Sequence, residues 1–222
     1  MSDDTQTVPR PASSRSAGGT RKGLETRARI IKGARTALEN DGIEAVTTRK
    51  IASSAKVRLA TLHYYFDSKE NLLLAVLQDM IDDMASAYLP AVPFAKDPDD
   101  RIAALIRLIW HYIGETRERQ LAQIELTLYA LRTRGAEWLA ERQYQAYIDF
   151  YGGLIFDDPD VSEEIRKRIG AAVARFILIG IDGLILQSFA LQDAAVANES
   201  VEVLIIATRD YLARLKTAEK IG

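Results

Sequence analysis

The sequence predicts an all-α protein of about nine helices, with a small N-terminal domain and a larger helical C-terminal domain. Apolar residues recur at the spacing of one helix face in every long segment, and no alternating strand pattern persists. Prolines and glycines divide the chain into segments of helical length. With 222 residues, 48% of them hydrophobic, the chain can bury a substantial core as one or two domains.

The first 20 residues are predicted to form a disordered N-terminal arm. They are rich in Ser, Thr, Pro and Gly and contain almost no large apolar residue, so burial cannot offset the entropy of folding them. We expect the rest of the chain to divide into two domains, residues 21–68 and residues 69–222.

A first helix is predicted over residues 24–40. Ile31, Ala34 and Leu38 form its apolar stripe. Gly42 follows the helix and is a stop signal, because glycine readily adopts the left-handed conformation that ends helices.

Residues 47–69, TTRKIASSAKVRLATLHYYFDSK, predict two short helices joined by a tight turn. Thr47 or Thr48 caps the first helix. The second helix begins near Leu59 and turns Leu62 inward. This arrangement is a helix-turn-helix, which places the N-terminal residues of its second helix in the major groove of DNA. The residues available on the outer side of that helix are Arg58, Leu59, Ala60, Thr61, His63 and Tyr64.

Residues 21–74 resemble the DNA-binding domain of the TetR family of bacterial transcriptional regulators. The resemblance implies a homodimeric repressor that binds a palindromic operator and is released by a small molecule bound in a helical ligand-binding and dimerisation domain. Lys56, Arg58 and Ala60 depart from a common Gly, Ser and Gly, and these departures bear on the turn geometry and the operator sequence. The matching residues are Thr47, Thr48, Ile51, Ala52, Ala55, Val57, Thr61, Leu62, Tyr64, Tyr65, Phe66, Lys69, Glu70, Leu72 and Leu73.

Candidate DNA-binding residues lie mostly in the basic part of the chain. Residues 21–66 hold ten Lys and Arg against four Asp and Glu, a charge of +6, whereas residues 67–222 hold seventeen against twenty-five, a charge of −8. A basic segment on an acidic body is the electrostatic footprint of a phosphate-binding domain. The candidates are Arg21, Lys22, Thr47, Thr48, Arg49, Arg58, Leu59, Ala60, Thr61, His63, Tyr64 and Lys69.

The remaining helices follow from caps and helix breakers. Asp67 and Glu70 are spaced as a capping box for a helix that runs to about residue 88. We expect this helix to connect the two domains and to transmit movement between them. Pro90 and Pro93 mark a loop, which ends where an Asp-Pro pair starts the next helix. Further helices are predicted over residues 119–134, 136–156, 162–190 and 199–216.

Residues 169–186 are apolar on almost every side. Arg175 and Asp182 interrupt them, so the segment lacks the ~18 uncharged apolar residues of a membrane span and no membrane is expected. Such a helix is buried all round, either by its own chain or by a second copy. Because the final helix is also apolar, we expect a four-helix homodimer interface. Its candidate residues are Arg175, Ile179, Gly183, Leu186, Val201, Leu204, Ile205 and Tyr211.

The larger domain also contains aromatic residues, methionines and acids in a combination that is unusual for an ordinary hydrophobic core. Aromatic rings with one or two acids suit an amphipathic or cationic small molecule, although for each single residue ordinary packing or a solvent-facing position is the favoured explanation. Residues 181–187, IDGLILQ, resemble the corresponding helix of choline-sensing, BetI-type regulators and favour a choline-like effector. The candidate ligand-binding residues are Met80, Met84, Trp110, Glu125, Tyr129, Tyr144, Tyr151 and Phe176.

No enzyme active site is expected. His63 and His111 fall in different domains, and the chain lacks a Gly-rich phosphate loop, a nucleophile elbow and an HExxH motif, so no metal or cofactor is predicted. The lack of cysteine and of an apolar signal segment favours the cytoplasm. Two alternatives stay open: a helical ligand-binding or scaffolding protein without specific DNA binding, and a TetR-type activator.

Overall fold

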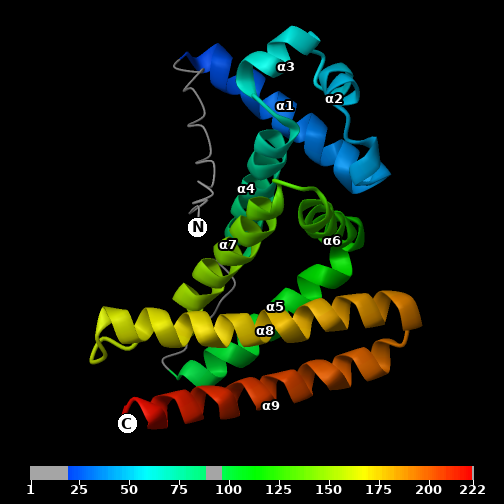
Figure 1. Ribbon diagram of the computed structural model, residues 1–222. Coiled ribbons are helices and arrows are strands. Elements are labelled where there is room, and N and C mark those ends of the chain that lie inside the picture. The colour runs from blue at the N-terminus through cyan, green and yellow to red at the C-terminus, as the bar shows by residue number, and fades with distance from the viewer. Residues whose placement is uncertain (1–19, 89–96, 222) are drawn as a thin grey trace, which may run out of the picture.

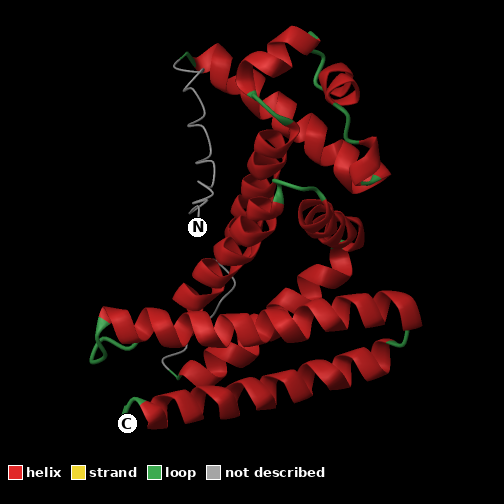
Figure 2. Cartoon of the chain, viewed as in Figure 1, coloured by secondary structure: helices red, strands yellow, loops and turns green. Residues whose placement is uncertain are grey.

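The computed structural model describes residues 20–88 and 97–221. Within those ranges the chain forms nine α-helices, one short 3-10 helix and no strand, which confirms the all-α prediction (Figure 2). Except for Thr20, the predicted arm lies outside the described residues, as do Pro90 and Pro93. The helices are α1 (Arg21–Asp41), η1 (Ile43–Ala45), α2 (Thr48–Ser54), α3 (Leu59–Tyr65), α4 (Lys69–Tyr88), α5 (Pro98–Glu115), α6 (Arg117–Arg132), α7 (Glu137–Ile155), α8 (Glu163–Leu191) and α9 (Ala194–Ala218).

Helices α1, α2 and α3 pack together at one end of the molecule and form the head, residues 20–66 (Figure 1). Ile30 and Leu38 of α1, Ile51 of α2 and Leu62 of α3 are almost completely buried and form its small core. Because these side chains come from all three helices, the short α2 and α3 are held by packing rather than by their own helix propensity.

The body consists of α4 to α9, residues 69–88 and 97–221. Helix α7 packs against α8 and crosses it at an angle, and α8 and α9 form a long pair at the end of the molecule farthest from the head (Figure 1). Helix α5 lies against α9, while α4 and α6 both contact α1 of the head. The head is therefore supported by two body helices rather than by α4 alone.

Two helices begin earlier than predicted because of polar caps. Helix α1 begins after Thr20, whose Oγ1 accepts a hydrogen bond from Gly23 N at 3.2 Å. Helix α9 begins after Asp193, whose Oδ1 accepts one from Val196 N at 3.1 Å. Each cap satisfies a backbone N–H that has no partner within the helix. The predicted break before residue 199 is consequently only two residues long.

The cap predicted for α4 was wrong. Ser68, and not Asp67, caps this helix, because Ser68 Oγ accepts a hydrogen bond from Asn71 N at 3.1 Å. Glu70 is engaged elsewhere and accepts a hydrogen bond from the Tyr129 hydroxyl at 2.6 Å. The acid that was expected to complete a local cap thus connects α4 to α6.

Helix α8 is long and apolar enough to cross a membrane by length and composition alone, a test that core helices of soluble proteins also pass. One side of α8, including Val173 and Ile177, is buried against its neighbours. It crosses α7 at Gly170, where a Cβ atom would lie 2.5 Å from Gly152 O. The opposite side is uncovered in the single chain: Ile179 is 67% exposed.

Candidate functional site

A lysine occupies the turn between α2 and α3. Lys56 has a φ of 52°, in the left-handed region where the family resemblance leads one to expect glycine. The turn is closed by a hydrogen bond from Val57 N to Ala52 O at 2.9 Å. Thr47 Oγ1 accepts a hydrogen bond from Lys50 N at 3.2 Å, which confirms Thr47 as the cap of α2. The departure from glycine is therefore accommodated within the helix-turn-helix.

Helix α3 turns a polar face toward solvent. Tyr64 is 67% exposed, and its ring meets the neighbouring Tyr65 ring edge-on with 5.2 Å between the centroids. Leu59, predicted on the outer side, is half-buried and packs against the core at the start of the helix. The exposed residues of this face are Arg58, Ala60, His63 and Tyr64, with Thr61 half-buried beside them.

Exposed basic residues flank α3 on the neighbouring helices. Arg49 lies on α2, and Arg21 and Lys22 lie at the start of α1, all exposed to solvent. Lys50, which sequence reasoning did not single out, pairs with Asp41 at 2.8 Å and ties α2 to the end of α1. Thr47 is exposed and Thr48 half-buried. These positions suit phosphate contacts, which fix the orientation of a DNA-binding domain without specifying sequence.

Lys69 lies between the head and the body. Its Nζ donates to Ile43 O at 3.4 Å and lies 4.6 Å from the centroid of the Tyr129 ring. Burial lowers the pKa of Lys69, while Glu70 opposes that shift. The side chain that was predicted to contact phosphate thus faces α6 in this structure.

We call the contact region between the head and α6 the joint. Its members come from α1, the α1–η1 link, η1, α4 and α6, and most are polar or charged. Burial alone would raise the pKa of Glu70, but hydrogen bonds from Tyr129, the backbone and Ser68 outweigh it and lower that pKa. Burial and the bond to Glu70 raise the pKa of Tyr129 to about 12. The joint comprises Glu39, Gly42, Ile43, Lys69, Glu70, Arg119, Glu125 and Tyr129.

A small cavity of about 50 Å³ lies inside the body, between α4, α5, α6, α7 and α8. Its wall combines aromatic, amide and aliphatic side chains with one carboxylate, Asp182. The Tyr151 hydroxyl donates to Met84 Sδ at 3.1 Å across the buried interior. The polar and sulfur-containing lining residues are Met84, Tyr112, Gln120, Gln123, Tyr147, Tyr151 and Asp182.

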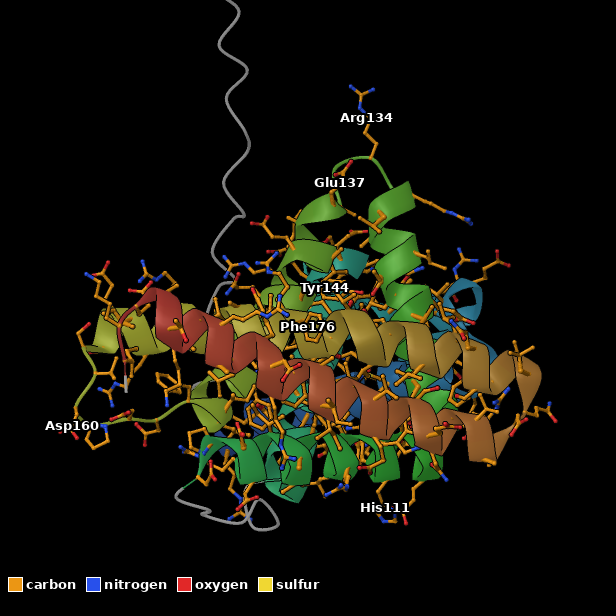
Figure 3. The ribbon with its side chains drawn as sticks, turned by 90° about the horizontal axis from the view of Figure 1, so that it is seen from below. His111, Arg134, Glu137, Tyr144, Asp160 and Phe176 are labelled. Atoms are coloured by element: carbon orange, nitrogen blue, oxygen red, sulfur yellow. The ribbon has the colours of Figure 1, made fainter. Side chains whose placement is uncertain are left out.

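Asp182 is the acid in the wall of this cavity. One of its oxygens accepts a hydrogen bond from the Tyr144 hydroxyl at 2.8 Å. Burial raises the pKa of Asp182, and the hydrogen bond from Tyr144 only partly offsets that shift. Figure 3 shows Tyr144 on α7 near the α8 crossing, with Phe176 on α8 close by in that view. A carboxylate disfavoured by burial in this way would be stabilised by a cation.

Tyr147 also lines the cavity, and its side chain is only 7% exposed. Its hydroxyl has no hydrogen-bond partner among the described residues. The neighbouring Gln143 accepts through Oε1 from Thr127 at 3.0 Å and donates through Nε2 to Gln123 O at 3.3 Å, and these two bonds leave one Nε2 hydrogen unused. A buried hydroxyl without a partner is costly, so a ligand that bonded to it would gain affinity.

Only some of the predicted ligand-binding residues meet at the cavity. Met84 and Tyr151 line it, and Tyr144 reaches it through Asp182. Glu125 and Tyr129 belong to the joint instead, and Met80 is a core residue of α4.

Two further candidates lie between α9 and its neighbours. The Trp110 indole donates to Asn198 Oδ1 at 2.9 Å, and the Phe176 ring packs on Tyr211 with 5.3 Å between the centroids.

Sequence reasoning left Asp182 out of the candidate set, although a single acid within an apolar helix was the signal that could have found it.

Comparison with known proteins agrees with this geometry. Residues 30–76, which run from α1 into α4, match the family model of bacterial regulatory proteins of the tetR family. The HTH-type transcriptional regulator BetI of Rhizobium meliloti (strain 1021) is 34% identical over 186 residues, which cover 82% of this chain and 85% of the relative. The chain belongs to the TetR family. It is therefore a transcriptional regulator of the helix-turn-helix type.

Two further TetR-type similarities extend over most of the chain. The nicotine-responsive transcriptional repressor HdnoR of Paenarthrobacter nicotinovorans is 26% identical over 168 residues, covering 75% of this chain and 85% of the relative. The multidrug binding protein EbrR, in a crystal structure with proflavin, is 25% identical with a TM-score of 0.58. That comparison covers 81% of this chain and 97% of EbrR.

The dimer face predicted from the two apolar C-terminal helices needs correction on α9. Val201, Leu204 and Ile205 are at most 9% exposed, because they pack inside their own chain. The apolar side chains that α9 leaves uncovered are Val203, 59% exposed, and Ile206, 61% exposed. On α8, Arg175, Ile179 and Leu186 are exposed as predicted, Gly183 is half-buried with no atom within 4 Å of a Cβ built there, and Tyr211 on α9 is half-buried.

Within the part of the chain that the structure describes, no group of His, Cys, Asp and Glu side chains is arranged to hold a metal ion. Titratable groups gather in the cavity, in the joint and around Arg35, which pairs with Asp79 at 2.7 Å and with Asp83 at 2.6 Å. None of these three groups combines a nucleophile with an adjacent base. The TetR-type relatives are transcriptional regulators, and this arrangement is consistent with a binding protein.

Proposed function

We propose that this TetR-family regulator is a cytoplasmic homodimer that represses transcription from a palindromic operator and is released by an organic cation. The observation that carries the proposal is the presence of two distinct sites in one chain. An exposed, polar α3 stands on a basic head, and a small cavity lined by tyrosines and a half-buried acid lies in an acidic body. A small molecule regulates such a protein when it binds the two states of the body with different affinity.

The DNA-binding part of the proposal rests on the exposed face of α3. Arg58, Thr61 and His63 carry the hydrogen-bonding groups that read base edges in a major groove. Exposed cations on the flanks, including Arg49 and Lys22, supply sequence-independent attraction to phosphate. A single short helix reads few base pairs, so specificity on a genome needs two heads on one palindromic site.

The dimer is proposed to form through the uncovered sides of α8 and α9. Ile179, Leu186, Val203 and Ile206 are each more than half exposed in the single chain. Apolar side chains gathered on two neighbouring helices expose a patch that soluble monomers seldom retain. A two-fold axis through this patch would bury it in a four-helix interface and fix the distance between the heads.

The effector is proposed to be an organic cation held by Asp182 and the surrounding tyrosines. Aromatic faces attract cations, and the attraction is larger where water is excluded. HdnoR is nicotine-responsive and EbrR was crystallised with proflavin, and both small molecules carry a nitrogen that is protonated near neutral pH. These relatives, together with the half-buried acid Asp182 of this chain, support a cationic effector.

The test begins with the full-length chain and a library of genomic DNA fragments. We expect a dimer in solution, as measured by light scattering, and enrichment of fragments that carry a palindrome. Binding to the enriched fragment should weaken steeply with salt, because phosphate contacts release counterions. A monomer, or a chain that enriches no fragment, would rule out the proposal. Transcription that rises on binding would identify an activator instead of a repressor.

A further inference from the structure

Helix α6 leaves a row of leucines exposed on the surface of the body. Leu121, Leu128 and Leu131 are between 38% and 59% exposed, and we call these three residues the leucine stripe. Their spacing of seven and three residues places them on one face of the helix, opposite the buried Leu126. Soluble proteins seldom leave several neighbouring apolar side chains exposed on one surface unless a partner covers them.

Opposite charges lie at the two ends of the leucine stripe. Glu118 is in the first turn of α6, before Leu121, and Arg132 is in the last turn, after Leu131. Both side chains are exposed, and neither forms a hydrogen bond or an ion pair with the rest of the described chain. By contrast, the neighbouring Arg119 is paired with an acid of α1. One acid and one cation are therefore available to a molecule that covers the stripe.

A second copy of α6 complements both features when the two helices run antiparallel. In a two-fold pair the contacts are reciprocal, so Leu121 of each copy faces Leu128 of the other. Glu118 lies three residues before Leu121, and Arg132 lies four residues after Leu128, so each Glu118 comes beside the Arg132 of the other copy. The antiparallel pair thus covers leucines at its centre and joins opposite charges at both ends, whereas a parallel pair would bring like charges together.

We propose that the leucine stripe is a second self-association surface, through which α6 of one dimer binds α6 of another dimer in antiparallel register. The stripe lies on a different helix from the uncovered patch of α8 and α9, so one chain can use both surfaces. A contact made by one pair of helices belongs to the weak, transient class of interfaces. It joins dimers at high local concentration, as at two neighbouring operators, and the consequence for operators rests on the proposed function.

The contact is tested first at its centre. Sedimentation velocity of the full-length chain is recorded over a wide range of protein concentration at low salt, and we expect dimers that associate further as concentration rises. Leu128→Glu should weaken this association by roughly 10-fold or more, because a charge replaces a buried leucine. It should leave the α8–α9 dimer and its affinity for a single operator unchanged. Leu24→Glu is the matched control, because Leu24 is an exposed leucine near the start of α1.

The charges at the ends of the stripe test the register. Glu118→Lys or Arg132→Glu alone brings like charges together at both ends of the helix pair, and each should weaken association by roughly 3- to 10-fold. An equal mixture of these two variants places opposite charges at both ends again and should restore the parent association. Glu141→Lys is the control, because Glu141 is an exposed acid of α7 outside the stripe.

Restoration in the mixture separates contact from stability. Damage to the fold of either variant would persist when the two proteins are mixed, whereas a contact between copies recovers. A parent that stays at one size over the whole concentration range would overturn the proposal and leave the stripe to a different protein. Weakening by both variants without recovery in the mixture would also overturn it. If Leu128→Glu does not fold, the two charge variants and their mixture decide.

The outcome is distinguishable from that of the proposed function. With Ile179→Glu and Ile206→Glu combined, the patch on α8 and α9 is disrupted, yet the leucine stripe should still join two chains at high concentration. That association should be weakened by Glu118→Lys. A chain that binds no operator can still associate through α6, and a repressor dimer can show no association through α6.

Discussion

The head and the body hold their candidate binding groups in opposite ways. On the head these groups are on the surface, as with Tyr64, which is 67% exposed. In the body they gather around a cavity of about 50 Å³, and Tyr147 in its wall is only 7% exposed. An exposed face can dock on DNA without rearrangement, whereas a cavity of this size must widen to hold an organic cation. Under the proposed function, the conformational change therefore begins in the body.

The largest effect on operator affinity should come from a variant that splits the dimer and leaves each head intact. Replacing both Ile179 and Ile206 with Glu places charges in the proposed dimer interface. We expect a monomer that binds its operator only non-specifically, so that operator affinity falls by ~10³-fold or more. Light scattering and fluorescence anisotropy measure the two properties. Leu131→Glu is the control, because Leu131 is 59% exposed but lies on α6. A monomeric double variant with unchanged operator affinity would show that one head suffices.

The next largest effect should be on the affinity for an organic cation, and it should be confined to the body. Asp182→Asn removes the cavity's carboxylate, and a charge-assisted contact of about 1.5–3 kcal/mol corresponds to a loss of roughly 10- to 150-fold in affinity for an organic cation. Calorimetric titration with benzyltrimethylammonium measures it. Operator affinity without the cation should stay at the parent value, because Asp182 is remote from the head. A matching loss in both affinities would contradict the division between head and body.

The cavity should also respond to pH in a way that the head does not. Burial raises the pKa of Asp182, so at acid pH the free chain holds a proton that a bound cation must displace. Cation affinity is expected to rise with pH through that raised pKa and then level off. The stability contribution has the opposite sign: the folded chain binds this proton more tightly, so folding is favoured below the unfolded pKa and weakens as pH rises through the folded pKa. In Asp182→Asn both pH dependences should be absent.

Single substitutions on the head should distinguish residues that contact base edges from residues that only attract phosphate. His63→Ala is expected to change the preference among operator variants by about 1–3 kcal/mol per base pair concerned. Arg49→Ala should weaken binding to all sequences alike and reduce the salt slope by about one. Anisotropy with a set of operator variants at several salt concentrations measures both. The prediction fails if Arg49→Ala alters preference and His63→Ala does not.

The smallest effect should come from the unpaired hydroxyl in the body. Tyr147→Phe removes a buried group without a hydrogen-bond partner, so we expect the ligand-free chain to be unchanged or stabilised by about 1 kcal/mol. Urea unfolding measures this change. Tyr144→Phe is the comparison, because it removes a hydroxyl that donates to Asp182 and should destabilise the ionised form of that acid. Destabilisation by Tyr147→Phe would mean that its hydroxyl is satisfied in solution.

The head was largely predictable because its signals are local. A Thr cap, small apolar residues at helical spacing and a short turn identify α2 and α3 from adjacent residues, and Thr47 caps α2 as expected. The cap of α4 was harder, because Asp67 and Ser68 are both polar and the choice depends on which one meets Asn71 N. Neighbouring residues of similar type leave such a choice to the final backbone geometry.

The body was less predictable because its candidate sites are assembled from distant segments. Helix α9 is apolar on several sides, so periodicity alone could not tell that Val201 and Ile205 face its own chain while Ile206 faces outward. Glu125 is an acid among apolar neighbours, which indicated a ligand pocket, yet its partner is the backbone of Ile43 in another domain. Only tertiary packing decides whether such an acid lines a ligand pocket or binds a backbone N–H of the other domain.

One measurement tests the central claim most directly: anisotropy of an enriched operator duplex bound to the wild-type chain, titrated with choline and with 3,3-dimethyl-1-butanol, its uncharged isostere. The same pair of additions is made with benzyltrimethylammonium and neopentylbenzene. We predict that at least one cation lowers operator affinity by the 5- to 150-fold typical of allosteric coupling, which is about 1–3 kcal/mol, while its isostere has little effect. Equal release by a cation and its isostere, or release that persists in Asp182→Asn, would contradict the account.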